Sequence, residues 1–371
     1  MIELRIGLEG VAVAESEISC VNGEKGELIY RGYWAEEAVK DHGFEAVVHL
    51  LWHGEFPTSD QLSAFKRDLA NRRVLPDYVK TIIKSLPKET TPMAALRTAI
   101  SSLTVPGESW PPTQTQAMDI LAKAPTIIAY HYRVQQGKEP IEPDTSLDHI
   151  ANYLYMLHGE SPRASFARAL ETYCMLSMDH DMNASTFTSR VVTATEADIV
   201  SAITAAIGAL IGPLHGGAPS KVDDMLDEIG TKDNAEPWLR EQLESGKRLM
   251  GFGHRVYKTY DPRAAALKVV TQQFSDESPL FELSLYVEEV AIRLLAEYKP
   301  GRNLYPNLEF WAAGVMRTID MPRELYTPTF CLSRIAGWSA HVMEQAANNR
   351  LIRPSVVYVG KRPETPPPSH V

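Results

Sequence analysis

The stretch LFELSLYVEEVAIRLLAEY, residues 280–298, decides the fold class of this chain of 371 residues. Its apolar side chains recur three and four positions apart, which places them along one face of an α-helix: Leu280, Leu283, Val287, Val290, Ala291, Leu294 and Leu295. The sequence Lys299-Pro300-Gly301 then ends the helix. Core packing accounts for such a stripe, so the stretch predicts a buried amphipathic helix.

Helical periodicity continues through most of the chain from Ala35 onward. Residues that commonly start helices recur along it: Ser59, Pro92, Pro162, Thr195, Pro219 and the pair Asp261-Pro262. The most apolar run, IVSAITAAIGALIG at residues 199–212, is too short to span a membrane, so we predict a buried helix. The fold class is therefore all-α and multi-helical.

Sequence typical of β-strands is concentrated near the N-terminus. Residues 17–31, EISCVNGEKGELIYR, contain two short β-prone pieces around Asn22-Gly23 and Gly26, which suit a tight turn. This pattern predicts a minor N-terminal β-hairpin.

Two junctions suggest a two-domain organisation. Gly216-Gly217 follow the predicted helix at 199–212 and precede Pro219, so they could form a hinge. We place the second junction near Pro322 to Pro328. The prediction is a large helical domain of residues 1–217 and 326–360, a small helical domain of residues 218–325, and a flexible tail at 361–371.

Composition narrows the class of protein. A formal net charge of −10 argues against a nucleic-acid partner, because phosphate binding normally requires a basic surface. The three cysteines, Cys20, Cys174 and Cys331, are odd in number and unpaired in spacing, so they indicate no disulfide framework and no cysteine metal site. The N-terminus does not resemble a secretory signal. We expect a cytoplasmic protein with no membrane partner.

The segment GFGHRVYKTYDPRAAA, residues 251–266, carries the strongest signal for chemistry. His254 follows two glycines, and Arg255, Lys258 and Arg263 place three cations nearby. Arg263 lies in the first turn of a helix that Asp261 caps, where a cation is unfavourable unless an anion is close. This favours an anionic ligand over a solvated basic loop. The segment lacks the third glycine and the preceding strand of a dinucleotide fingerprint.

Two further histidines lie in polar or glycine-rich turns. His215, in GPLHGGAP, follows a helix end, and a loop whose histidine contacts nearby helix carbonyls is as good an interpretation as a ligand site. His180, in MDHDMNASTF, has no second histidine or carboxylate at the helical spacing of a metal site. A hydrogen-bonding site or a helix-end turn is favoured there, and no metal is expected.

Three charged residues stand out for their surroundings. Arg334 lies in the apolar segment TFCLSRIAGWSAHVM, so it needs a carboxylate from the protein or from a ligand. Arg353, in LIRPS, also follows an apolar pair, but there a surface turn is the favoured interpretation. Glu309 is the second residue of a helix that Asn307 caps, a position that acids favour for electrostatic reasons alone.

Together these motifs resemble the citrate synthase family. The resemblance rests on HDMNASTF, GPLHGGAP, GFGHRVYKTYDPRA, the SR of LSRIAGW and the RP of LIRPS, in that order, and runs from about Ile6 to Gly360. The opening GEKGELIYRG is similar to the bacterial and archaeal dimeric branch, which includes 2-methylcitrate synthases. The resemblance implies an all-α homodimer whose large and small domains close over acetyl-CoA and oxaloacetate, with no metal and no cofactor.

The resemblance also implies roles for individual residues. His215 would bind the thioester carbonyl of acetyl-CoA, His254 would polarise the oxaloacetate carbonyl, and Glu309 would be the base. The expected oxaloacetate ligands are His180, Asn183, Arg263, Arg334 and, from the partner subunit, Arg353. The expected CoA ligands are Leu249, Met250, Gly251, Phe252, Gly253 and Lys258.

One position departs from the family pattern. The catalytic base is an aspartate in a segment of the form Asn-Val-Asp-Phe, whereas this chain has Glu309 in the sequence Asn307-Leu308-Glu309-Phe310. A carboxylate remains but lies one methylene further out, and a displacement of about 1 Å can cost on the order of 100-fold in rate. Three hypotheses follow: a citrate synthase, a 2-methylcitrate synthase acting on propionyl-CoA, and a substrate-binding homologue with impaired catalysis.

Overall fold

The computed structural model describes residues 4–215, 218–273 and 279–363. Within them, strands occur at the N-terminus as β1 (Ser19–Asn22), β2 (Glu27–Tyr30) and β3 (Tyr33–Trp34). They form an antiparallel sheet in the order β1-β2-β3, with Ser19 opposite Tyr30 in the first pair. The predicted hairpin is confirmed, and the short strand β3 extends it.

Sixteen α-helices make up most of the described part of the chain. Their bounds are α1 (Ala35–Asp41), α2 (Phe44–His53), α3 (Ser59–Asn71), α4 (Asp77–Ser85), α5 (Pro92–Ser101), α6 (Gln114–Gln135), α7 (His149–His158), α8 (Ala164–Ser177), α9 (Ala184–Thr193), α10 (Ile199–Ile211), α11 (Ala218–Ile229), α12 (Lys232–Glu244), α13 (Pro262–Gln272), α14 (Pro279–Tyr298), α15 (Leu308–Thr318) and α16 (Tyr326–Ala347). The all-α prediction is confirmed. Short 3₁₀ turns at Ile6–Leu8 and Arg323–Leu325 complete the elements.

The predicted helix starts agree with the structure where a local cap defines them. Helices α3, α5 and α13 begin at Ser59, Pro92 and Pro262, and the Asp261 side chain caps α13 by accepting the backbone N–H of Arg263. Helix α11 begins at Ala218, one residue before the predicted Pro219.

Two predicted starts lie too early in the sequence. Helix α8 begins at Ala164, two residues after Pro162. The start at Thr195 is wrong, because α10 begins at Ile199. There the Asp198 carboxylate accepts the backbone N–H of Ser201 at 2.9 Å and provides the cap.

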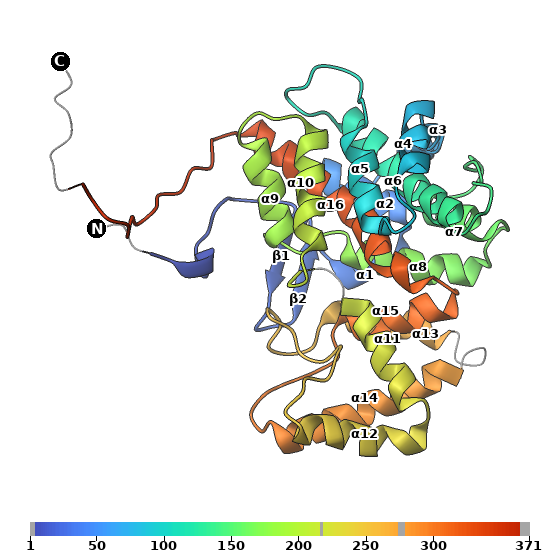
Figure 1. Ribbon diagram of the computed structural model, residues 1–371, viewed down its shortest axis with the longest axis vertical. Coiled ribbons are helices and arrows are strands. Elements are labelled where there is room, and N and C mark those ends of the chain that lie inside the picture. Colours follow the sequence, from blue (N-terminus) through green and yellow to red (C-terminus); the bar gives the residue numbers. More distant parts are fainter. Residues whose placement is uncertain (1–3, 216–217, 274–278, 364–371) are drawn as a thin grey trace.

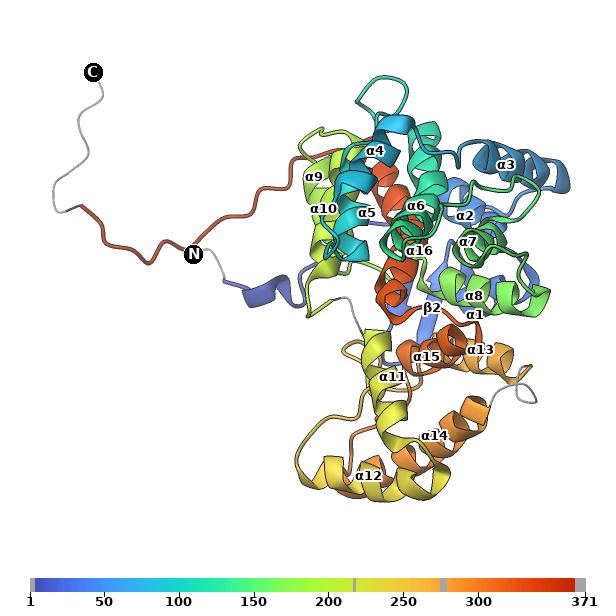
Figure 2. The same cartoon turned by 45° about the vertical axis from the view of Figure 1, so that its right-hand side comes forward.

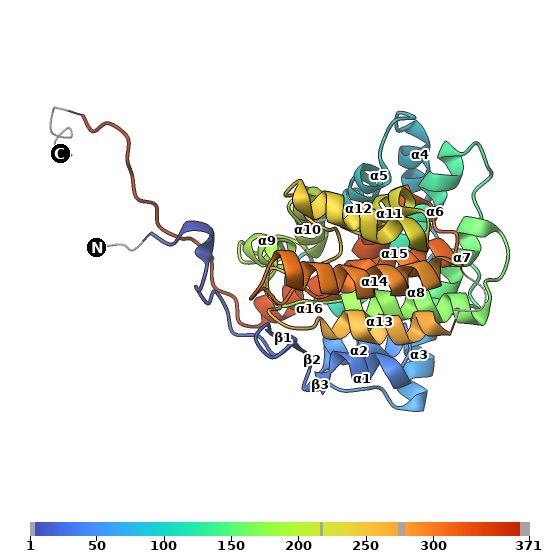
Figure 3. The ribbon, with the colours of Figure 1, turned by 90° about the horizontal axis from the view of Figure 1, so that it is seen from below.

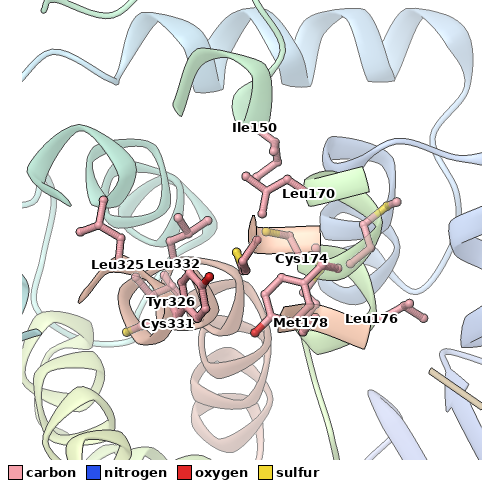
Figure 4. Close-up of a cluster of buried hydrophobic side chains, with 14 of the residues drawn as sticks. Ile150, Leu170, Cys174, Leu176, Met178, Leu325, Tyr326, Cys331 and Leu332 are labelled. Carbon is pink, nitrogen blue, oxygen red and sulfur yellow. The ribbon is translucent and has the colours of Figure 1, made fainter. Parts of the chain in front are cut away.

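Helix α16 runs through the larger part of the molecule and is surrounded by other helices (Figure 1). It packs against α2, α6, α8, α9 and α10. Where α7, α8 and α16 meet, Ile150, Leu170, Cys174, Cys331 and Leu332 are buried together (Figure 4). All three cysteines of the chain are free thiols.

Helices α11 to α15 gather at one end of the molecule (Figure 2). Helices α12 and α14 pack on each other and lie farthest from the larger part of the molecule (Figures 1 and 2). Helices α13 and α15 pack between them and α8. This end falls within the predicted small domain of residues 218–325, whose boundaries stay a prediction.

Some features of the sequence analysis fall beyond what the structure describes. Gly216 and Gly217 of the predicted hinge lie outside the described residues, as do residues 364–371 of the predicted tail. Among the helices that are described, none is both long and apolar enough to cross a membrane.

Candidate active site

The structure brings together six of the predicted site residues from six separate segments. The contributing segments are the turn between α8 and α9 with His180, the end of α10 with His215, the loop before α13 with His254, the first turn of α13 with Arg263, the first turn of α15 with Glu309, and the middle of α16 with Arg334. The rings of His180 and His254 lie edge to face, with centroids 5.5 Å apart. The site therefore lies where the larger part of the molecule meets helices α13 and α15.

His254 is held with one ring nitrogen facing its own loop. Its Nδ1 accepts the backbone N–H groups of Val256 and Tyr257 at 3.0 and 3.2 Å, so the proton of the neutral ring lies on Nε2. Burial and the neighbouring positive charge of Arg263 lower the pKa of His254 to about 4. Near pH 7 this side chain is a neutral imidazole with a single N–H to donate.

Arg263 is almost fully buried, with 6% of its surface exposed, and is paired with Asp261. Its Nε and Nη2 donate to the two oxygens of that carboxylate at 2.9 and 2.8 Å. We predicted Asp261 as a cap alone, and the structure shows that it also supplies an anion to Arg263. The anionic ligand that the sequence favoured at this position stays a prediction. Asp261 also accepts the backbone N–H of Leu308 at 3.1 Å, which joins α13 to the start of α15.

His254 and Arg263 each direct a hydrogen-bond donor toward the same position in the site. Nη2 of Arg263 lies 3.4 Å from Nε2 of His254. Since Nδ1 of His254 already accepts two N–H groups, both of these nitrogens carry protons and do not hydrogen-bond to each other. An acceptor oxygen placed between them would satisfy both.

His215 is fixed by Ser185 at the start of α9. Its Nε2 accepts the Ser185 backbone N–H at 3.3 Å and lies 2.7 Å from the Ser185 hydroxyl, which leaves the ring proton on Nδ1. Burial lowers its pKa to about 4, with a further contribution from the positive charge of Arg334. These contacts use Nε2 alone, so the alternative in which His215 contacts nearby helix carbonyls stays an interpretation.

Glu309 lies in the first turn of α15, as predicted. Asn307 caps this helix by accepting the Glu309 N–H at 3.1 Å, and its amide donates to the Gly253 carbonyl at 2.9 Å. Oε2 of Glu309 is enclosed and has no hydrogen-bond partner among the described residues. Burial raises the pKa of this carboxyl to about 7, which is the range that suits a general base.

Arg334 is 2% exposed and makes no ion pair with any described residue. Its Nε donates to the Ser177 carbonyl at 2.7 Å, and the guanidinium lies over the Phe330 ring with its carbon 4.6 Å from the centroid. The sequence left open whether Arg334 forms a structural salt bridge. The described part of the chain contains no such salt bridge. The charge of Asp179 acts on the guanidinium without forming an ion pair with it. N–H groups of Arg334 therefore stay available to a ligand carboxylate.

His180 and Asn183 lie in the turn between α8 and α9. His180 Nε2 lies 3.3 Å from the Tyr257 hydroxyl, and burial together with the positive charge of Arg263 lowers the pKa of His180 well below its usual value. Asn183 uses its side-chain oxygen to cap α9, since that oxygen accepts the Thr186 N–H at 3.1 Å. The predicted role of Asn183 in binding oxaloacetate stays a prediction.

A cavity of about 820 Å³ adjoins His254, and we call it the cationic cavity. Among the predicted CoA ligands, Leu249, Phe252, Gly253 and Lys258 line it, whereas Met250 packs against the core and Gly251 lies against Phe310. Six cations line it, namely Lys247, Arg248, Arg255, Lys258, Lys299 and Arg302. Within residues 4–215, 218–273 and 279–363, none of the six has an acidic partner.

The described residues contain no cluster of three or more histidine, cysteine, aspartate or glutamate side chains suited to a metal ion.

Comparison with known proteins identifies the family. The profile described as "Citrate synthase, C-terminal domain" matches residues 7–355, nearly the whole chain. The chain belongs to the citrate synthase family. It is thus an enzyme of the citrate (Si)-synthase type, as the motif analysis predicted.

Relatives in the citrate synthase family include both activities considered above. The chain is 40% identical to the citrate synthase of Haloferax volcanii over 97% of each chain. It is also 40% identical to the 2-methylcitrate synthase of Mycobacterium tuberculosis, over 96% of this chain and 91% of the relative. The solved ternary complex of Thermoplasma acidophilum citrate synthase with carboxymethyl coenzyme A and oxaloacetate is 31% identical, covers 99% of both chains and matches with a TM-score of 0.88.

Arg353, a residue expected from the citrate synthase resemblance, lies in a separate place. It is exposed in the C-terminal segment and lines a groove of about 990 Å³ together with Arg31, Arg190 and Glu344. No contact joins it to His254, Arg263 or Arg334 among the described residues. Its predicted role across a subunit interface stays a prediction.

Sequence reasoning missed several residues of this citrate synthase site. Asp261 was seen only as a cap, and Ser185, which holds His215, was not singled out. Four of the cations around the cavity were also missed: Lys247, Arg248, Lys299 and Arg302. A signal was present, because each pair of cations follows the end of a helix, α12 or α14, but helix ends favour cations for electrostatic reasons in any case.

Proposed function

We propose that this enzyme condenses acetyl-CoA with oxaloacetate and water to give citrate and CoA. The observation that carries the proposal is that two neutral imidazoles and one enclosed carboxyl share the same buried arginines. The charge of Arg334 acts on both His215 and Glu309, and the charge of Arg263 acts on both His254 and Glu309. A neutral imidazole donates one hydrogen bond to a carbonyl oxygen without first carrying a charge. Two such donors suit a reaction in which two carbonyl groups gain negative charge.

The first step would form the nucleophile. The Glu309 carboxylate removes a proton from the acetyl methyl group, while Nδ1–H of His215 donates to the thioester oxygen, where negative charge develops. With its pKa raised to about 7, Glu309 is a stronger base than an ordinary carboxylate and is still largely ionised just above neutral pH.

The second step would form the carbon–carbon bond. The enolate carbon attacks the carbonyl carbon of oxaloacetate, and the developing alkoxide accepts hydrogen bonds from Nε2–H of His254 and from Arg263 in the position between them. The proton that Glu309 removed balances the one that the alkoxide gains when the hydroxyl of the citryl intermediate forms. Arg334 would hold one carboxylate of oxaloacetate, because a guanidinium matches a carboxylate with two parallel hydrogen bonds. The N–H groups of Arg263 that Asp261 leaves free would donate to the other carboxylate. Water then hydrolyses the thioester of the citryl intermediate, releasing citrate and CoA.

The cationic cavity supports CoA as the second substrate. CoA carries phosphate groups, and the six cations that line this cavity have no acidic partner among the described residues, in a protein of net charge −10. The cavity adjoins His254, so a CoA bound there would reach its thioester into the catalytic site. We propose no cofactor and no metal, since the chemistry requires only proton transfers and hydrogen-bond donors.

A homodimer follows from the same proposal. Exposed apolar side chains concentrate in the N-terminal segment, with Ile6 and Val11, and in the C-terminal segment, with Leu351, Val356 and Val359. Both segments line the groove that contains Arg353 and extend away from the helices (Figure 3). A second copy of the chain would cover these side chains and would carry its own Arg353 toward the site. We propose that this enzyme works in the cytoplasm.

Propionyl-CoA is the second candidate donor, because a citrate synthase and a 2-methylcitrate synthase are each 40% identical to this chain. One methylene in an apolar pocket discriminates by only about 1–3 kcal/mol, so both donors could be accepted.

The test is release of CoA thiol by wild type and by Glu309→Asp and Glu309→Gln, with acetyl-CoA or propionyl-CoA, in the presence and absence of oxaloacetate. The proposal expects thiol release by wild type that requires oxaloacetate and a loss of about 100-fold or more in Glu309→Gln. Higher kcat/KM with propionyl-CoA would identify the 2-methylcitrate activity instead. Oxaloacetate binding without turnover, unrescued by Glu309→Asp, would show a substrate-binding homologue.

A further inference from the structure

Tyr257 contacts three of the predicted substrate ligands but has no role in the mechanism above. It lies in the loop between His254 and α13 and is 2% exposed. Its ring lies 4.9 Å from the His254 ring and 5.5 Å from the His180 ring, measured between centroids. The third contact is with Arg263, whose guanidinium carbon lies 5.5 Å from the centre of the tyrosine ring.

The hydroxyl of Tyr257 is directed at His180. The oxygen lies 3.3 Å from Nε2 of His180, and the hydroxyl has no other partner among the described residues. Burial raises the pKa of the phenol, so it keeps its proton, while the lowered pKa of His180 keeps that ring neutral. A neutral phenol and a neutral imidazole thus share this hydrogen bond, which fixes the orientation of the His180 ring.

The face of Tyr257 makes a separate contact with Arg263. Asp261 occupies one edge of the Arg263 guanidinium, and the aromatic ring lies over the group as a second contact. A cation over an aromatic face is attracted to it without using a hydrogen-bond donor. Donors of Arg263 thus remain available to a substrate carboxylate.

The backbone around Tyr257 is held by the N-terminal hairpin. The neighbouring Lys258 N–H donates to the Gly23 carbonyl at 2.9 Å. A Cβ atom at Gly23 would lie 2.2 Å from the Val256 carbonyl oxygen, so the hairpin turn and this loop pack with no room for a side chain. Tyr257 is therefore presented to His180 and Arg263 on a braced backbone.

We propose that Tyr257 is a positioning residue of the oxaloacetate site, whose hydroxyl orients His180 and whose ring holds the Arg263 guanidinium. The inference rests on the proposed function, since it concerns the binding of oxaloacetate. The two parts of the Tyr257 side chain have different roles, which substitutions can test one at a time. The hydroxyl contacts His180, and the ring contacts Arg263.

The test compares Tyr257→Phe, Tyr257→Leu and the control Tyr260→Phe by calorimetric titration with oxaloacetate and, separately, with CoA. Tyr260 lies in the same loop, is 58% exposed and stacks on Tyr305 away from the site histidines. Loss of the hydrogen bond in Tyr257→Phe should weaken oxaloacetate binding about 5- to 10-fold and leave CoA binding and kcat within about 2-fold. Tyr257→Leu, which also loses the ring face, should weaken oxaloacetate binding by a further several-fold, and Tyr260→Phe should match wild type.

The outcomes separate this inference from the proposed function. If wild type binds oxaloacetate and Tyr257→Phe binds it equally well, Tyr257 has no positioning role and the inference is overturned. The inference is also overturned if oxaloacetate and CoA binding weaken together, because that result indicates general damage to the loop. If wild type binds no oxaloacetate, the proposed function fails first and this inference fails with it.

Discussion

Two groups of arginines in this molecule differ in how their charge is balanced. Arg317 and Arg323 form ion pairs with Asp223 and Asp227 of α11, and these pairs connect α11 to α15 and to the turn before α16. Arg334 lies in the following helix, α16. Its side chain is more deeply buried than the side chains of Arg317 and Arg323, and it forms no ion pair with a carboxylate among the described residues. The arginines that connect the helices thus form ion pairs, whereas Arg334 forms none in the described part of the chain.

Arg317 and Arg323 have a structural role, whereas the charge of Arg334 is available to a ligand. A buried cation without a partner destabilises the folded protein, so its retention indicates a partner that arrives later. The same contrast holds on the surface, where Lys232 and Arg293 pair with Glu282 and Glu236, whereas the six cations of the cationic cavity lack such partners in the described chain. Substitutions in each group should therefore affect different properties.

The largest effect is expected for Arg334→Ala. Removing a buried partner of a substrate carboxylate should lower kcat/KM for oxaloacetate by roughly 100- to 1,000-fold, with little loss of folded protein. The matched control is Arg317→Ala, which breaks two ion pairs and should lower the melting temperature while kcat/KM stays within about 3-fold. Equal losses of kcat/KM in the two variants would remove the distinction between the groups.

A smaller effect, about 10- to 100-fold on kcat/KM for oxaloacetate, is expected for Arg353→Ala, because its guanidinium would contact the substrate from the second subunit. Mixed dimers of Arg353→Ala and Arg334→Ala subunits test the sharing directly. One site of each mixed dimer would then contain both arginines, so a random mixture should recover about a quarter of wild-type activity. A mixture no more active than its two components would place each site within one subunit.

A still smaller effect is expected in the cationic cavity. The double variant Lys299→Ala, Arg302→Ala should raise the KM for acetyl-CoA about 10-fold and weaken its dependence on salt, since exposed charges act through a screened field. The matched double variant Lys232→Ala, Arg293→Ala removes paired cations from the neighbouring helices α12 and α14 and should leave that KM unchanged. A KM that rises equally in both would indicate an effect of net charge alone.

The fold could be predicted from the sequence because its signals are local. The apolar stripe at residues 280–298, the cap and proline at Asp261-Pro262 and the cap at Asn307 each define a helix through neighbours in the chain. The start at Thr195 failed for the same reason, because Asp198 offered a better cap three residues later. Helix boundaries thus depend on which of several nearby caps forms the hydrogen bond.

The site could be predicted in part, and what was missed depends on distant contacts. His254 and Arg263 lie nine residues apart and were found together, whereas Ser185, which holds His215, lies thirty residues from it. Whether Arg334 had a carboxylate partner could not be decided from its apolar neighbours, because any partner would come from another helix. The pKa of Glu309 likewise depends on burial beneath other segments, which its place in a helix cap does not reveal.

The central claim is that Glu309 acts as the base beside two neutral histidines, and the pH dependence of kcat/KM for acetyl-CoA tests it most directly. The carboxyl, with its pKa raised to about 7, is protonated and inactive at low pH, so kcat/KM should rise through about pH 7 and then level off. The histidines, with pKa values lowered to about 4, should add no falling limb between pH 5 and pH 8.5. A kcat/KM that falls as the pH rises through this range would mean that a protonated histidine is required, and it would contradict the account.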